Sequence, residues 1–120
     1  MATRVLLVED NAVYRSSLEL LLGLQTGLEV VGAVGTGDEA AKAARELAAD
    51  VVLMDYRLPG LDGAAATRAV IAASGAAVVC LTAEATAEER EEILRAGAVA
   101  LVEKGSPIDG LAGAIRAAAA

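Results

Sequence analysis

The segment Val51-Val52-Leu53-Met54-Asp55 decides the fold of this chain, because four apolar residues run without interruption into an aspartate. An apolar run that does not alternate with polar residues is typical of a strand buried on both faces of a sheet. Four further runs of this kind are Arg4 to Val8, Glu29 to Gly35, Val78 to Leu81 and Val99 to Val102. A helix-length segment follows each run. We therefore predict an α/β fold with five parallel strands, the third over Val51 to Met54, and helices on both faces of the sheet.

Local signals mark where the helices between these strands begin and end. A threonine followed three positions later by glutamate predicts capping boxes at Thr36 to Glu39 and Thr86 to Glu89. Ser106 predicts a further cap, with Pro107 at the first helical position, where the missing N–H of proline does no harm. Three glycines are expected to end helices in the left-handed conformation: Gly27, Gly75 and Gly97.

The length of 120 residues suits one buried core and is too short for two ordinary domains. We expect a single domain over residues 1–120, without an output domain in this chain. Hydrophobic residues make up 56%, yet the longest uncharged run, Ala69 to Ala83, is shorter than the roughly 20 residues that span a membrane. The segment Met1 to Arg4 lacks an export signal, and the single Cys80 cannot form an internal disulfide. These features predict a soluble, cytoplasmic protein in which Cys80 is a small buried residue.

The charge balance excludes several classes of function. A net charge of −7 repels phosphate backbones and anionic lipids, so direct binding to nucleic acid or to membranes is not expected. The absence of histidine excludes Ser-His-Asp and Cys-His catalysis and metal sites built on imidazole. The chemistry of the chain must depend on carboxylates, lysine, hydroxyl groups and backbone amides.

Polar residues directly follow four of the predicted strands: Glu9, Asp10, Asp55, Thr82 and Lys104. The carboxyl ends of parallel strands meet at one edge of an open sheet, so these side chains are expected to share a pocket. Three carboxylates about 5 Å apart repel one another by roughly 3 kcal/mol per pair, and they need a cation. Magnesium fits, because it prefers oxygen ligands and leaves positions for phosphate oxygens. We predict that Asp55 forms an aspartyl phosphate, with Lys104 and Thr82 contacting the phosphoryl oxygens.

Four short motifs occur in order, each at the end of a predicted strand: residues 8–10 (VED), 54–63 (MDYRLPGLDG), 81–83 (LTA) and 103–105 (EKG). Together they resemble the response-regulator receiver domains of two-component signalling, over essentially the whole chain. The resemblance implies the flavodoxin-like receiver fold, with strand order 2-1-3-4-5. Residues 57–63 are most similar to receivers that precede a LuxR-type helix-turn-helix, which implies the receiver of a transcriptional regulator.

The resemblance also implies a function. A histidine kinase would phosphorylate Asp55 in a magnesium-dependent reaction, and phosphorylation would change which partners the domain binds. Asp10, Asp55 and the backbone carbonyl of Arg57 would hold the Mg²⁺ ion, with Glu9 acting through water. Ala83 would offer its backbone amide to the phosphoryl group. Such a domain is not an enzyme, beyond phosphorylating itself from small donors and hydrolysing its own aspartyl phosphate.

Two features of this chain bear on its signalling. The family usually has an aromatic residue three positions before the lysine, and Leu101 stands there, so the usual aromatic switch is absent. Arg57 and Glu84 lie two residues after Asp55 and Thr82, and they carry opposite charges. We hypothesise that these two residues pair across the pocket mouth and slow the loss of the phosphoryl group.

The first helix is more apolar than contact with a core requires. Projected at 100° per residue, its apolar side chains cover roughly 200°, whereas a core-facing stripe needs about 100°. We predict that Tyr14 and Leu21 pack inward. The excess residues are expected to be exposed, and these are Val13, Leu20 and Leu24. Together with the last helix, this surface is predicted to dock the kinase near Val13 and to support a homodimer near Leu20 and Leu24.

Three other functions fit these residues less well. The main alternative is a small magnesium-dependent phosphohydrolase with an aspartyl-phosphate intermediate, but such an enzyme needs a second acid where this chain has Arg57. A flavin protein of the same topology needs a glycine- and hydroxyl-rich loop where this chain has Glu9 and Asp10. The stretch Gly32 to Gly37 does not follow the first strand, so a strand end and turn explain it better than a dinucleotide site.

Overall fold

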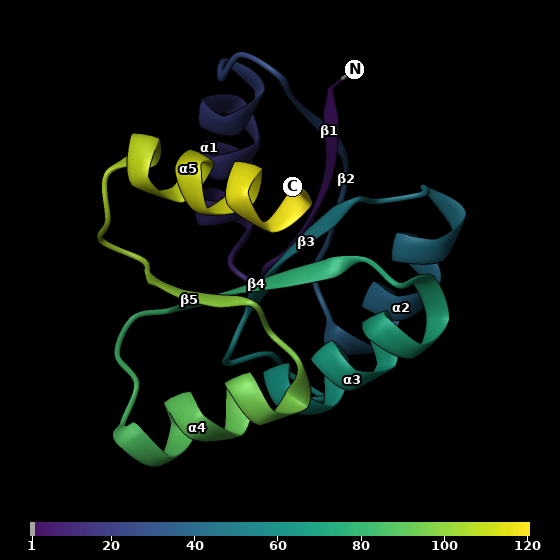
Figure 1. Ribbon diagram of the computed structural model, residues 1–120, viewed down its shortest axis with the longest axis vertical. Helices are drawn as coiled ribbons and strands as arrows, with labels where there is room; N and C mark the ends of the chain where they lie inside the picture. The colour runs from purple at the N-terminus through teal and green to yellow at the C-terminus, as the bar shows by residue number, and fades with distance from the viewer. Residues whose placement is uncertain (1) are drawn as a thin grey trace.

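A computed structural model describes residues 2–120 as strands and helices in strict alternation (Figure 1). The strands are β1 (Thr3–Val8), β2 (Leu28–Val34), β3 (Val51–Asp55), β4 (Ala77–Thr82) and β5 (Ala100–Glu103). The helices are α1 (Ala12–Gly23), α2 (Gly37–Glu46), α3 (Gly63–Ser74), α4 (Ala87–Ala96) and α5 (Ile108–Ala119). All five predicted strands are confirmed, and their ends differ from the predicted ones by one residue at most.

The strands form one parallel sheet in the predicted order, β2-β1-β3-β4-β5. The register pairs Val8 with Met54, Asp55 with Leu81, and Thr82 with Glu103. The last residues of β1, β3, β4 and β5 therefore lie nearly level along one edge. Side chains that follow these strands are brought together there, although they come from distant parts of the chain.

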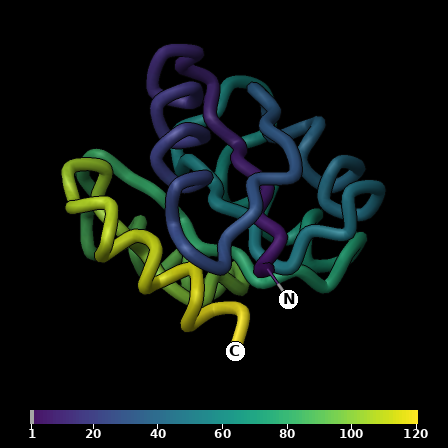
Figure 2. The backbone as a smooth tube through the Cα atoms, turned by 90° about the horizontal axis from the view of Figure 1, so that it is seen from above, coloured from purple at the N-terminus to yellow at the C-terminus, as the bar shows by residue number. Residues whose placement is uncertain are grey.

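Helices cover both faces of the sheet: α1 and α5 lie on one face, and α2, α3 and α4 lie on the other (Figure 1). Figure 2 shows α5 (yellow) beside α1 (dark blue), and the Arg116 guanidinium donates a hydrogen bond to the Thr26 carbonyl at 2.8 Å. Leu7 of β1 lies in the same apolar core as Ile115 of α5. The preceding residue, Leu6, lies in the core under α2, α3 and α4, as expected for a strand buried on both faces.

The two predicted capping boxes have different outcomes. At the start of α4, Thr86 accepts a hydrogen bond from the Glu89 amide, and the Glu89 carboxylate accepts one from the Thr86 amide, so this box is confirmed. The box at Thr36 is wrong, because the Thr36 side chain makes no capping hydrogen bond. The Glu39 carboxylate reaches one residue further back instead and accepts from the Gly35 amide at 3.3 Å.

The other predicted helix ends are partly correct. Gly75 and Gly97 end α3 and α4 in the left-handed conformation, as expected. Gly27 also has a left-handed φ of 82°, but it lies in the turn beyond the end of α1 and ends no helix. Pro107 is the N-cap of α5 and not its first helical residue, so that start was predicted one residue too early.

Ala48, just after α2, has a left-handed φ of 50°. Its N–H donates to the Arg45 carbonyl, and the Ala49 N–H donates to the Ala44 carbonyl at 3.0 Å, which together form a Schellman motif. A side chain costs about 1 to 2 kcal/mol in this conformation, whereas glycine adopts it freely. We predict that Ala48→Gly raises the free energy of urea unfolding by about 0.5 to 1 kcal/mol, after the greater chain entropy of glycine is deducted.

A matched control for this prediction lies inside the same helix. Ala41→Gly places glycine in the middle of α2, where it should lower the free energy of unfolding by about 1 kcal/mol. A loss of stability in Ala48→Gly similar to that of the control would contradict the prediction.

Two expectations from composition concern the interior and the membrane. Cys80 is fully buried in β4, as predicted, and burial together with the charge of Asp55 raises the pKa of its thiol to about 12. Within residues 2–120, no helix has both the length and the apolar character needed to cross a bilayer.

Candidate functional site

Residues from four strand ends meet at the carboxyl edge of the sheet. Glu9 and Asp10 follow β1, Asp55 is the last residue of β3, Thr82 is the last of β4, and Lys104 follows β5. The Thr82 carbonyl accepts a hydrogen bond from the Lys104 amide at 2.8 Å, which ties the last two of these ends together. The structure thus brings together the five residues that the sequence placed in one pocket.

The centre of the site is a group of three carboxylates. One oxygen each from Glu9, Asp10 and Asp55 lie within 4.8 Å of one another. Glu9 is 1% and Asp55 3% exposed, whereas Asp10 is exposed at the surface. Buried carboxylates are strongly destabilising unless cations and hydrogen bonds compensate them.

Lys104 supplies part of this compensation. Its ammonium nitrogen lies 2.7 Å from Glu9 Oε1 and 3.3 Å from Asp55 Oδ2. Burial alone would lower the pKa of Lys104, but the hydrogen bond to Glu9 and the charge of Asp55 raise it above its usual value. Burial alone would likewise raise the pKa of Glu9, but other contacts, chiefly the hydrogen bond from Lys104, lower it. Both residues of the pair are therefore charged at neutral pH.

Tyr14 on α1 positions this lysine. Its hydroxyl donates to the Lys104 backbone carbonyl at 3.4 Å, and the Lys104 ammonium lies 5.0 Å from the centre of the Tyr14 ring. Sequence reasoning assigned Tyr14 to packing and missed this contact. The sequence did contain a signal for this contact, because Tyr14 lies four residues after Asp10, in the first turn of the helix that begins at the site.

Asp55 is less well compensated than Glu9. Burial and, next, the neighbouring Glu9 raise the pKa of Asp55 from 3.8 to about 6. Lys104 and the Arg57 amide, which lies 3.3 Å from Asp55 Oδ1, act in the opposite direction. Asp55 is therefore mostly ionised at neutral pH, in a place where a further cation would be favourable.

The three carboxylates suit Mg²⁺. In octahedral coordination with bonds of about 2.0 to 2.1 Å, neighbouring ligand oxygens lie about 3 Å apart and opposite ones about 4 Å. The 4.8 Å limit on the oxygens of Glu9, Asp10 and Asp55 is close to this range, and the exposed Asp10 side chain has room to move. All three donors are hard oxygen atoms, which favours Mg²⁺ over softer metals.

The loop between β3 and α3 forms the floor of the site. The Tyr56 carbonyl accepts a hydrogen bond from the Gly63 amide at 3.0 Å, and a Cβ atom on Gly63 would lie 2.6 Å from that carbonyl oxygen. Gly60 has a left-handed φ of 74°. Asp62 is the N-cap of α3 and accepts from the Ala65 amide at 2.9 Å. The motif at residues 54–63 therefore encodes a tight loop as well as the acidic residue that begins it.

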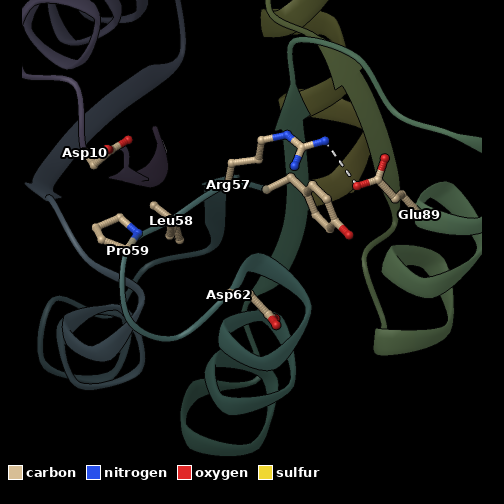
Figure 3. Close-up of a pocket in the computed structure, with 7 residues that line it drawn as sticks. Asp10, Arg57, Leu58, Pro59, Asp62 and Glu89 are labelled. Carbon is tan, nitrogen blue, oxygen red and sulfur yellow. Dashed lines mark hydrogen bonds and ion pairs between the residues drawn. The ribbon is translucent and has the colours of Figure 1, made fainter.

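A pocket of about 460 Å³ opens above this loop (Figure 3). Its lining residues come from the loops after β1 and β3 and from α4: Asp10, Tyr56, Arg57, Leu58, Pro59, Asp62 and Glu89. The Arg57 side chain crosses one side of the pocket toward Glu89 on α4, and its Nη2 lies 3.2 Å from Glu89 Oε2.

The predicted pairing of Arg57 with Glu84 is therefore wrong. Glu84 is exposed in the loop before α4, and its backbone carbonyl accepts a hydrogen bond from the Thr82 hydroxyl at 2.9 Å. The capping box fixes Glu89 at the start of α4, where its carboxylate faces Arg57. Sequence spacing contained no signal for this pair, because its residues lie 32 positions apart, one on the loop after β3 and the other in the first turn of α4.

Comparison with known protein families identifies the family to which this site belongs. The family model of the response regulator receiver domain matches residues 5–116. This chain belongs to the response-regulator receiver family. The resemblance found in the sequence motifs is thereby confirmed, and the chain is a receiver domain of response regulators.

Individual receivers support the same assignment. The response regulator GacA of Pseudomonas viridiflava is 38% identical over 114 residues, which cover 94% of this chain and 53% of GacA. A solved two-component response regulator of the LuxR family from Aurantimonas has a TM-score of 0.90 at 31% identity, covering 98% of this chain and 84% of that one. The chain spans about half the length of GacA, and the predicted similarity to LuxR-type receivers is confirmed.

A third receiver is informative about the acidic site. The receiver domain of the sensor histidine kinase PA1611 from Pseudomonas aeruginosa has a TM-score of 0.85 at 34% identity, covering 98% of this chain and 97% of that one. That structure has a magnesium ion coordinated in its active-site cleft. The acidic site of receivers binds Mg²⁺, and the carboxylate cluster of this receiver has the matching chemistry.

Three further predicted positions of this receiver concern the phosphoryl group and its readout. The Thr82 hydroxyl is directed toward the Glu84 carbonyl, so it must rotate before it can bind a phosphoryl oxygen. Ala83 follows at the exposed start of the same loop. Leu101 is half-buried on β5 and packs against the core under α2, α3 and α4.

The apolar surface predicted on α1 of the receiver is present. Val13, Leu20 and Leu24 are 78%, 66% and 73% exposed, which confirms their predicted exposure but does not test their predicted partners. Leu21 was expected to pack inward, yet it is 43% exposed. It lies about 100° around the helix from the fully buried Leu22, and so it falls at the edge of the core contact.

Proposed function

We propose that this receiver accepts a phosphoryl group on Asp55 from a histidine kinase in a magnesium-dependent reaction, and that phosphorylation changes its partner binding. The observation that carries the proposal is the buried, mostly ionised Asp55 carboxylate held 3.3 Å from Lys104 and beside two further carboxylates. Asp55 as nucleophile, Lys104 as counter-charge and the carboxylates as metal ligands would then act in one site.

The transfer is a substitution at phosphorus. A carboxylate oxygen of Asp55 attacks the phosphorus atom, and the new O–P bond forms as the bond from phosphorus to the kinase imidazole nitrogen breaks. The imidazole leaves with the electron pair of that bond and takes up a proton from solvent. In self-dephosphorylation Asp55 is the leaving group: water attacks phosphorus and loses a proton to solvent, and the Asp55 carboxylate leaves with the electron pair of the broken O–P bond.

Several residues would stabilise the charge that develops on the phosphoryl oxygens. Bound Mg²⁺ would supply electrostatic stabilisation of those oxygens, held by Asp10, Asp55 and the Arg57 carbonyl, with Glu9 acting through water. Lys104 is already beside Asp55 and needs little movement to reach a phosphoryl oxygen. Thr82 would turn from the Glu84 carbonyl to donate to a second oxygen, and the Ala83 amide would bind a third.

We place the protein in the cytoplasm as the receiver of a LuxR-type transcriptional regulator, with residues 1–120 as one domain and DNA contacted elsewhere than through this acidic domain. Its output is binding and not enzymatic turnover. The kinase would dock near Val13, and a homodimer would form near Leu20 and Leu24 and through α5. Arg57 would set the lifetime of the phosphoryl group, whereas the role of Glu84 depended on a pairing with Arg57 that the structure does not have.

Intact-mass measurement after incubation with acetyl phosphate and Mg²⁺ tests the proposal. We expect the wild type to gain one phosphoryl group, and Asp55→Asn to gain none, because an amide is too weak a nucleophile at phosphorus. Asp62→Asn is the matched control, since Asp62 lines the same pocket and asparagine preserves its capping of α3. Phosphorylation of Asp55→Asn, or rapid turnover of phosphate esters by the wild type, would overturn the proposal.

A further inference from the structure

The Arg57 side chain points away from Asp55, although the two residues are close in the sequence. Its backbone amide lies 3.3 Å from Asp55 Oδ1, yet its guanidinium points across the pocket to Glu89, 3.2 Å away (Figure 3). The guanidinium also lies 5.6 Å from the centre of the Tyr56 ring. An extended arginine side chain spans about 7 Å, so from this backbone position the guanidinium can reach either Glu89 or a group bound to Asp55.

Glu89 has two separate tasks in this arrangement. Its Oε1 accepts from the Thr86 amide at 3.0 Å and completes the capping box of α4. Its Oε2 binds Arg57. The same carboxylate therefore connects the loop after the phosphorylated residue to the first turn of α4.

A phosphoryl group on Asp55 would compete with Glu89 for this arginine. It is a dianion with three acceptor oxygens, which guanidinium groups bind more strongly than they bind a single carboxylate oxygen. The Arg57 side chain is 68% exposed, and such exposed pairs contribute at most about 1 kcal/mol. The pair with Glu89 is therefore weak enough for Arg57 to exchange partners. It is also strong enough to change the affinity of the site for a phosphoryl group severalfold.

We infer that Glu89 is a positioning residue that holds Arg57 away from Asp55 in the unphosphorylated receiver and gives it up to the phosphoryl group. The release removes Arg57 from Glu89, so phosphorylation changes the contacts at the start of α4. This inference rests on the proposed function. It supplies a connection from Asp55 to α4 that does not use an aromatic residue at position 101.

The variant Glu89→Gln separates the two tasks, because glutamine still completes a capping box but carries no charge for Arg57. The probe is beryllium trifluoride with Mg²⁺, which binds a carboxylate oxygen as a tetrahedral phosphoryl analogue. Without the competing carboxylate, we expect Glu89→Gln to bind the probe about two- to fivefold more tightly than the wild type in calorimetric titration. Raising the salt concentration should reduce the difference.

Controls distinguish this competition from a general effect of charge. Glu88→Gln removes the same charge from an exposed neighbour in α4, and we expect it to change the affinity much less. Arg57→Ala removes the guanidinium but keeps the backbone carbonyl. In this background, adding Glu89→Gln should change the affinity for the probe no more than Glu88→Gln changes it in the wild type. An unchanged affinity in Glu89→Gln, or a full effect without Arg57, overturns the inference. A wild type that binds neither the probe nor a phosphoryl group overturns the proposed function instead.

Discussion

Asp10→Asn is expected to weaken Mg²⁺ binding about a hundredfold or more, which corresponds to roughly 3 kcal/mol. With Lys104 included, the four charged groups at the site sum to −2, from three carboxylates and one ammonium. The substitution halves that charge and replaces a charged ligand by a neutral oxygen. Asp10 is also a suitable position to substitute, because its side chain is exposed and its loss should leave the core intact.

Calorimetric titration with Mg²⁺ at about pH 8, well above the pKa of Asp55, measures this effect. Asp62→Asn provides the matched comparison, because it removes one carboxylate from the same pocket while the N-cap of α3 is retained. Equal losses of affinity in the two variants would mean that Mg²⁺ responds only to the overall charge of the pocket. An unchanged affinity in Asp10→Asn would refute the assigned ligands.

The second large effect is expected on stability: without Mg²⁺, Asp55→Asn should raise the free energy of unfolding at neutral pH by about 2 kcal/mol. The folded-state pKa of Asp55 is about 6, above its ordinary 3.8, so the folded protein binds this proton more tightly than the unfolded chain. The stability that this proton contributes is fully present below about pH 3.8 and is lost as the pH rises through about 6. Asparagine does not titrate, so the variant avoids this loss.

Urea unfolding in EDTA between about pH 4.5 and pH 8 measures this prediction. The advantage of Asp55→Asn over the wild type should grow with pH up to about 6.5 and then become constant. Mg²⁺ should stabilise the wild type and remove most of the difference, because the cation compensates the ionised Asp55. A variant that is less stable than the wild type at pH 8 would contradict the proposed cost of the buried charge.

The sequence was sufficient for the framework of the site because the framework follows from topology. A continuous apolar run that ends in Asp55 indicates a strand buried on both faces, and the strand order that the receiver resemblance implies then brings Glu9 and Lys104 to the same edge, although they lie 95 residues apart. Neither conclusion requires knowledge of a side-chain rotamer. The family motifs contributed the roles of these residues, and those roles stay predictions until they are measured.

The sequence was insufficient wherever the answer depended on how a flexible side chain turns. Arg57 has two carboxylates of the β4–α4 region within its reach, and the local spacing favoured Glu84, whereas the capping box presents Glu89. The capping box predicted at Thr36 failed for the same reason, because the Glu39 carboxylate accepts from the Gly35 amide instead.

The contact between Glu9 and Lys104 has a consequence for how the domain folds. It joins the first and last strands of the chain, and two other strands separate them in the sheet. A contact that closes so long a loop forms late in folding, because the chain entropy it consumes has to be offset by structure already present. Interactions absent from the folding transition state slow unfolding without accelerating folding. We therefore expect the ion pair at the phosphorylation site to act mainly on how long each folded molecule persists before it unfolds.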